Sequence, residues 1–244
     1  MKSVKGSREK QELPPMKSGS FRLIVMGSLI VAGLSLPAIS AAADKDGAGL
    51  GIGLRYSTLG GGVVIGKSLG KNFSVRVGLN SFSEGATEEI DGIQYDADLD
   101  LSSTSLMFDW YPFGGSFHFT AGYVNSDNEL IGQATPTGSV NIGGEIVVPV
   151  TAGDLVLDGN IQIGSGPFVG LGFGNVPEKG FGLVLEAGVI RSGAPDISLE
   201  VSGDATLIAA IDQADIDAEI AAMQGDLEEF DIFPVIAVGF SYGF

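Results

Sequence analysis

The chain has 244 residues, no cysteine and a formal net charge of −17. The lack of cysteine excludes a disulfide framework, a thiol nucleophile and a thiolate metal site, and the excess of acids excludes a protein that binds the phosphate backbone of nucleic acid. The 38 glycines disfavour helices and suit tight turns and crowded interiors.

Residues 1–43 are typical of an N-terminal extension followed by an export signal. A basic stretch precedes an apolar run at 23–36, and small residues follow at 40–43, before the first acids of the next segment. About 14 apolar residues are too few to cross a bilayer comfortably. We therefore expect a signal peptide that is cleaved near residue 43 and export through the general secretory route. The sequence leaves open whether Met1 or Met16 is the true start.

Residues 44–244 are predicted to form a single domain of amphipathic strands. Successive side chains of a strand point to opposite faces, and here apolar residues alternate with small, polar or charged ones. The eight predicted strands lie at about 50–56, 63–65, 73–79, 106–110, 117–123, 169–173, 181–189 and 236–244. A glycine-rich turn after Leu59 leaves open whether residues 49–69 form one bent strand or two.

The predicted connections alternate between short and long. Short turns are expected at 70–71, 112–116 and 175–180, and long loops at 83–97, 125–165 and 192–230. Bacterial outer-membrane barrels have short periplasmic turns and long external loops. The sequence therefore predicts an all-β fold, an eight-stranded antiparallel transmembrane β-barrel with long acidic extracellular loops. A soluble barrel is disfavoured, because the faces opposite the apolar ones carry charges that suit a polar lumen.

Four charged side chains fall on the predicted inward face of the barrel. Isolated charges in a water-poor lumen are costly, whereas paired charges form a plug. Counted from the short turns, Arg76 and Asp109 lie low on neighbouring strands, while Arg55 and Glu186 lie higher. We predict that these two bases and two acids pair as a lumen charge network. The unknown register leaves open which base meets which acid.

Most acids lie in the predicted external loops. Of the 28 acids after residue 43, 23 fall within 84–100, 125–165 and 192–231, where there is no Lys or Arg. Asp96, Asp98 and Asp100 follow strand spacing, which places them about 7 Å apart on one face. Hard divalent cations take carboxylate oxygens, so loosely bound Ca²⁺ or Mg²⁺ is one interpretation. A solvated, cation-screened surface is the other, and the lack of a calcium-loop motif favours it. No other cofactor is predicted.

One helix is predicted, at residues 205–230 in the last long loop. Asp204 is placed to cap it, and its apolar residues recur at helical spacing. These residues are Ile216, Ile220, Met223, Leu227 and Phe230. An apolar stripe usually means packing, so we favour a cap that packs on the loops over a gating or partner-binding element.

Two features of the sequence imitate catalytic or nucleotide-binding motifs. Residues 61–68 (GGVVIGKS) match the phosphate-loop pattern, but a turn and a strand follow instead of the required helix, so we predict no nucleotide binding. His118 is the only histidine and faces inward by parity. Nothing near it in the sequence supplies a nucleophile and an orienting group. We therefore interpret His118 as an ordinary lumen residue and predict that the protein is not an enzyme.

The C-terminal residues 233–244 (FPVIAVGFSYGF) carry the most specific resemblance. They resemble the closing strand of bacterial outer-membrane barrels, in which a terminal Phe and alternating aromatics form the assembly signal. The resemblance assigns that role to Phe240, Tyr242 and Phe244. Residues 48–244 as a whole resemble small eight-stranded proteins of the OmpA-type barrel superfamily. The segments YDADLDL and DWYPFGGSF also resemble a proteobacterial outer-membrane group without an assigned activity.

This resemblance implies a location and partners. It implies the bacterial outer membrane, contact with its lipid and with lipopolysaccharide, and insertion by the barrel-assembly machinery. Because the sequence ends on the predicted last strand, we expect no peptidoglycan-binding domain of the kind that larger relatives carry. We expect a non-enzymatic envelope-structural or surface-interaction role through the acidic loops. A narrow cation-preferring channel is the alternative, since acidic vestibules concentrate cations, although side chains usually fill an eight-stranded barrel. A lipid-modifying enzyme ranks third.

Overall fold

A computed structural model of the protein describes residues 49–90, 93–142, 146–151, 153–175, 179–209, 211–227 and 230–244. The described residues belong to one compact unit. The predicted signal peptide and its cleavage site lie outside the described residues.

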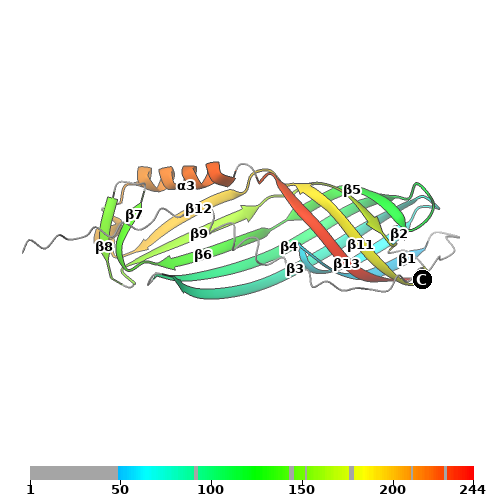
Figure 1. Ribbon diagram of the computed structural model, residues 1–244, viewed down its shortest axis with the longest axis horizontal. Helices are drawn as coiled ribbons and strands as arrows, with labels where there is room; N and C mark the ends of the chain where they lie inside the picture. The colour runs from blue at the N-terminus through cyan, green and yellow to red at the C-terminus, as the bar shows by residue number, and fades with distance from the viewer. Residues whose placement is uncertain are drawn as a thin grey trace, which may run out of the picture. The chain divides into compact units, whose positions relative to one another are not determined.

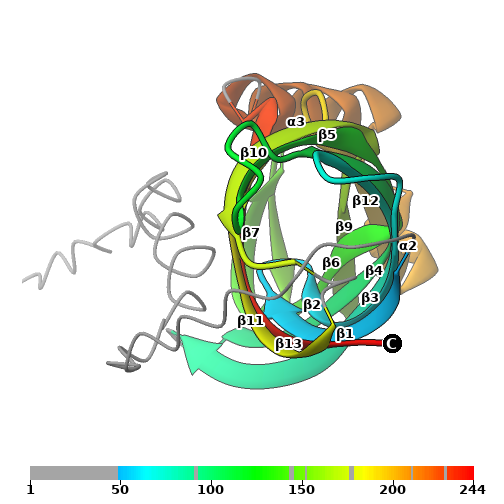
Figure 2. The ribbon, with the colours of Figure 1, turned by 90° about the vertical axis from the view of Figure 1, so that its right-hand side faces the viewer.

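Eight antiparallel strands close into a ring, which confirms the predicted barrel. Neighbouring strands pair in the order β4-β3-β2-β1-β13-β11-β10-β5, and a further β5–β4 pairing closes the ring. Figure 2 looks into this ring from the end with the short turns. The ring strands are β1 (Leu50–Ser57), β2 (Gly60–Ser68), β3 (Phe73–Ile90), β4 (Ile93–Trp110), β5 (Phe117–Ser126), β10 (Gly166–Phe173), β11 (Gly180–Arg191) and β13 (Ile232–Gly243). Only Thr58 and Leu59 separate β1 from β2, so this part of the chain forms two strands.

The barrel has its apolar side chains on the outside and its polar side chains inside. Exposed and buried residues alternate along β1 and β13, as the period of two along a strand requires. Outward-facing Leu54 and Phe240 are 64% and 66% exposed, whereas inward-facing Arg76 is 3% exposed. This polarity is the reverse of that in a soluble barrel.

Beyond the ring, the same sheet continues on one side of the barrel wall as a part that we call the extension. Its strands pair in the order β12-β9-β6-β4-β3, of which β4 and β3 contribute their distal parts. Its added strands are β6 (Asn128–Thr135), β9 (Leu155–Ile163) and β12 (Asp196–Gly203). A separate hairpin is formed by β7 (Gly138–Ile142) and β8 (Ile146–Val150). Figure 1 shows these strands at the end of the barrel away from the C-terminus.

The extension corrects the prediction of long loops. The segments predicted as loops at 83–97 and 125–165 are largely strands, and the segment at 192–230 contains β12 and helices. β3 and β4 each run for 18 residues and pair along their whole length. The chain after β5 continues alongside β4 as β6, and β12 pairs with β9. In these strands polar residues alternate with half-buried apolar residues on the opposite face. The many acids among the polar residues favoured a loop prediction, so this alternation was not recognised as a strand pattern.

Two helices replace the single predicted helix. They are α2 (Ala205–Ile208) and α3 (Gln213–Leu227). Asp204 caps α2, where its carboxylate accepts from the backbone N–H groups of Thr206 and Leu207. Buried Leu155 packs with apolar residues of β9, β12 and the helical segment, so the helices act as a packing cap, as predicted. Among the described residues, no helix is both long and apolar enough to cross a bilayer.

Candidate functional site

Arg76 lies at the centre of a buried cluster of charges in the lumen. Its Nε and Nη2 donate to the two carboxylate oxygens of Asp109 at 2.7 and 2.8 Å, a bidentate geometry that makes charge-assisted hydrogen bonds strong. Its Nη2 also donates to the carboxylate of Glu186, which lies on β11. The exposed fractions of Arg76, Asp109 and Glu186 are all below 5%. One guanidinium therefore ties three strands of the ring together.

The Asp109 carboxylate accepts four hydrogen bonds. Besides the two from Arg76, Ser74 Oγ donates to Oδ2 and Thr120 Oγ1 donates to Oδ1, each at 2.8 Å. A carboxylate offers about four lone-pair sites, so Asp109 is saturated. Tyr111 extends the network toward the short turns, because its hydroxyl lies 3.3 Å from Ser74 Oγ and donates to Asn175 at 3.1 Å.

Arg55 joins the same cluster more loosely. Its Nε donates to Asn80 Oδ1 at 2.9 Å, and its Nη1 lies 3.8 Å from Glu186 Oε1. The structure thus brings together all four residues of the predicted lumen charge network, with Arg76 between both acids. Two positive and two negative charges balance inside the barrel.

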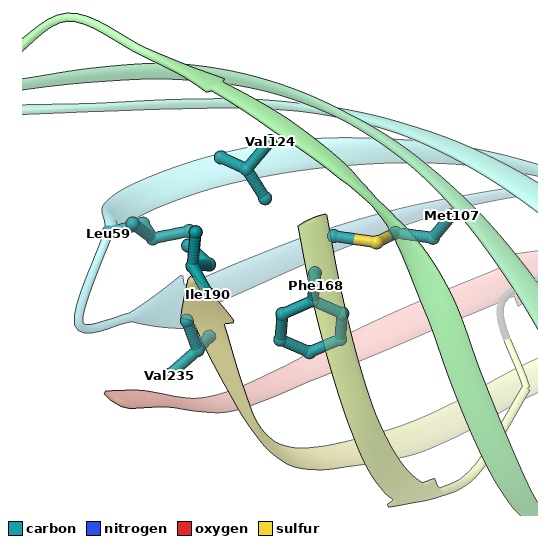
Figure 3. Packing of buried hydrophobic residues seen from close by; sticks show 6 residues of the cluster. All are labelled: Leu59, Met107, Val124, Phe168, Ile190 and Val235. Atoms are coloured by element: carbon teal, nitrogen blue, oxygen red, sulfur yellow. The ribbon is translucent and has the colours of Figure 1, made fainter. Parts of the chain in front are cut away.

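An apolar layer fills the lumen beyond the charges. Figure 3 shows six buried side chains that converge inside the ring. They are Leu59, Met107, Val124, Phe168, Ile190 and Val235. We call this set the apolar layer. The alternation pattern did not reveal it, because all of these residues except Met107 lie outside the predicted strands.

Glycines make room for the large lumen side chains. A Cβ atom at Gly170 or Gly188 would overlap the Phe168 ring, and one at Gly172 would overlap the imidazole of His118. These positions face bulky groups from their own or a neighbouring strand, so a close approach to the backbone is required there. The glycine alternation in the sequence therefore marks where the lumen is most crowded.

His118 is buried beside the charge cluster. Its ring lies 5.1 Å from the ring of Tyr111, and its Nδ1 is 3.2 Å from the carbonyl oxygen of Ser116. Sequence reasoning placed His118 in the lumen but missed its position next to Asp109 and Glu186. That position follows from the register between β4 and β5, which pairs Asp109 with Thr120. The sequence alone does not give this register.

Asp109, His118 and Glu186 form the one metal-ligand-type cluster among the described residues, with ligand atoms within 4.8 Å of one another. A divalent cation does not fit there. Asp109 has no free lone pair, and Arg55 and Arg76 already neutralise both carboxylates. Adding two positive charges to a balanced buried cluster would be costly.

The three acids of the divalent-cation hypothesis lie on one face of β4 in the extension. Their cross-strand partners on β3 are Thr87, Gly85 and Ser83, opposite Asp96, Asp98 and Asp100 respectively. They do not converge as a cluster of three within 4.8 Å in the described structure. Hydrogen bonds from the Thr87 hydroxyl and the Gln94 amide hold the pKa of Asp96 below its usual range. Asp96 is therefore charged at neutral pH, and the cation hypothesis stays a prediction.

The residues of the proposed assembly signal lie on the outer face of β13 and at its end. Phe240, Tyr242 and Phe244 are 66%, 40% and 71% exposed. Tyr242 contacts the rings of Phe181 and Phe244, and the Phe244 N–H donates to the carbonyl of Leu50. The aromatic residues thus mark the seam between the first and last strands. Their role in assembly stays a prediction.

Comparison with known proteins supports the fold. Neither a protein-family description nor a curated protein sequence matches this chain. The crystal structure of Acinetobacter baumannii CarO2 matches with a TM-score of 0.54 and 20% identity, covering 81% of this chain and 99% of that one. That of Acinetobacter baumannii CarO gives the same TM-score and identity, with 82% and 100% covered. At this identity the similarity shows a shared fold, and membership of the OmpA-type superfamily stays a prediction.

Replacing Glu186 by Gln tests the charge network. The variant keeps the shape of the side chain but leaves two arginines with one carboxylate, so we expect a loss of about 1–3 kcal/mol in the free energy of unfolding. Urea unfolding of the barrel refolded in phospholipid vesicles measures it. Glu200→Gln, an exposed acid of the extension, serves as the control, with an expected change within about 0.5 kcal/mol. Unchanged stability and conductance in Glu186→Gln would rule out a polar plug.

Proposed function

We propose that this protein is an integral outer-membrane β-barrel with a closed lumen, which acts through its extension in a surface-interaction or envelope-structural role and has no enzymatic activity. The observation that carries this proposal is that two layers of side chains, one charged and one apolar, fill the barrel.

The outer surface of the barrel supports a membrane location. A tilted membrane-spanning strand needs about 9–11 residues, and the ring strands β2, β5 and β13 have 9, 10 and 12 residues. Aromatic side chains gather at the end with the short turns, where Trp110, Phe113 and Phe181 are all exposed. Such girdles lie at the interface between lipid and water.

The interior supports a closed lumen. A cavity beside Arg55 and Arg76 has a volume of about 20 Å³, which is room for about one water molecule. Eight-stranded barrels are just wide enough for side chains to fill. An open path for solutes would require both the charge network and the apolar layer to rearrange.

The extension supports a role at the surface. Across its strands acids face acids directly, since Asp100 pairs with Glu129 and Asp158 pairs with Glu200. Like charges directly opposite one another destabilise a sheet, and hard divalent cations relieve such repulsion. We propose that Ca²⁺ or Mg²⁺ bridges this acidic face to the phosphate groups of lipopolysaccharide. In this proposal the barrel-assembly machinery recognises the C-terminal aromatic residues Phe240, Tyr242 and Phe244.

Conductance in planar bilayers tests the closed lumen. The refolded barrel is verified by its heat-modifiable gel shift and measured at pH 7.5 with and without millimolar Ca²⁺. We expect a silent bilayer under both conditions. Discrete cation-selective steps that Ca²⁺ blocks would instead favour the second candidate, a cation channel, for which the acidic residues on the extension would concentrate cations.

A further inference from the structure

The imidazole of His118 has one nitrogen that the network leaves without a partner. Nδ1 lies 3.2 Å from a backbone carbonyl, which only accepts, so Nδ1 carries the proton and Nε2 has the lone pair. In the described structure Nε2 has no hydrogen-bond partner, and neither has Glu186 Oε1. His118 is 1% exposed and Glu186 is 4% exposed. Two buried acceptors therefore face the same cluster without a donor.

The charged groups around His118 come from four strands. Asp109 on β4 and Glu186 on β11 place carboxylate oxygens within 4.8 Å of a ring nitrogen. Arg76 on β3 binds both acids, and Arg55 on β1 reaches Glu186. The other neighbours are neutral, namely the ring of Tyr111 and the backbone of β10 at Gly172. With a neutral imidazole, the cluster therefore has no net charge.

We propose that His118 is a proton-operated latch on the closed lumen. A proton taken up at Nε2 turns the ring into a buried donor in the same cluster as the Glu186 carboxylate, whose Oε1 has no hydrogen-bond partner. It competes there with Arg55, whose guanidinium is 3.8 Å away and makes no hydrogen bond to that oxygen. The buried cluster then carries one uncompensated positive charge, which is unfavourable without added water. The small cavity beside Arg55 has room for about one water molecule, so further water requires the side chains of the cluster to move apart.

This inference rests on the proposed function, because only a closed lumen has a latch. The chain suits the test unusually well, since His118 is its only histidine. Histidine is the side chain whose ordinary titration falls between pH 5 and 8. Comparison with a variant at this one position therefore tests whether a response in that range comes from His118.

The experiment compares bilayer conductance at pH 7.5 and pH 5.0 for the wild type and His118→Gln, which cannot take up a proton. We expect the wild type, which is silent at pH 7.5, to gain discrete conductance steps at pH 5.0, where the imidazole takes up its proton. His118→Gln is expected to stay silent at both values.

The outcomes separate the latch from the proposed function. Wild-type conductance already present at pH 7.5 contradicts the closed lumen and the latch together. A wild type without a rise at pH 5.0, or an equal rise in His118→Gln, overturns the latch and leaves the closed lumen standing. If His118→Gln does not refold, the wild-type curve decides, because a flat response between pH 7.5 and 5.0 overturns the latch.

Discussion

Replacing Arg76 by Met is expected to destabilise the barrel by about 3–5 kcal/mol, a large part of the usual stability of a folded protein. The reason is the position of the guanidinium, which donates to both Asp109 and Glu186 in the buried lumen. Met fills a similar volume but neutralises neither acid. Two carboxylates then stay buried, and Arg55, 3.8 Å from Glu186, is the remaining positive charge of the network. Urea unfolding in phospholipid vesicles gives the difference in the free energy of unfolding.

The chain offers a matched control for this variant. Arg191 also pairs with an acid, Asp231, but the two atoms are 4.0 Å apart and the arginine side chain is 78% exposed. Exposed pairs contribute about 0–1 kcal/mol, so Arg191→Met is expected to be close to the wild type. A double variant, Arg76→Met with Asp109→Asn, removes one orphaned charge and is expected to recover part of the loss. Equal stability of Arg76→Met and Arg191→Met would contradict a central role for Arg76.

The ring of the barrel could be predicted from the sequence, because its walls obey a simple physical rule. Outside, lipid-compatible side chains are required at every second residue, and the segments from Phe73 to Leu79 and from Phe181 to Val189 keep that period. The short turns follow from glycine and proline between such segments. The eight predicted strands are the eight strands that close the ring.

The extension could not be predicted in this way. Paired residues such as Leu99, Leu130 and Ile161 give its sheet an apolar face, but each strand contributes only a few such residues between acids and amides. On β4, Asp96, Asp98 and Asp100 alternate with half-buried Ala97 and Leu99. A run of acids was interpreted as a loop, but the pairing of β4 with β3 and β6 holds it extended. Tertiary pairing therefore overrides a composition that favours loops.

The charge network was partly accessible from sequence. Parity identifies the inward charged residues, and charge balance predicts that they pair. The alternation of side chains along a strand does not give the register between strands. It therefore could not show that Arg76 contacts both acids, or that Ser74 and Thr120 also donate hydrogen bonds to the Asp109 carboxylate. The position of His118 depends on the same register.

Replacing Phe168 by Ala is expected to cost about 3–5 kcal/mol and to open the apolar layer. Phe168 is 1% exposed and packs in the centre of this layer. Its ring lies against Gly170 and Gly188, whose lack of side chains makes the space that it occupies. Glycines have no side chain that could move into the cavity left by the ring, so the cavity stays largely open. The loss in the free energy of unfolding is therefore expected in the upper part of the usual range.

The adjacent residue supplies the control for Phe168→Ala. Val169 points to the outer face and is 57% exposed, so Val169→Ala keeps the lumen intact and is expected to change stability by less than about 1 kcal/mol. Urea unfolding and bilayer conductance at pH 7.5 are measured for both variants. Because the charge network lies below the apolar layer and stays paired, we expect Phe168→Ala to be less stable but still silent. Conductance in Phe168→Ala would show that the apolar layer alone seals the lumen, and a stability equal to that of Val169→Ala would contradict the packing argument.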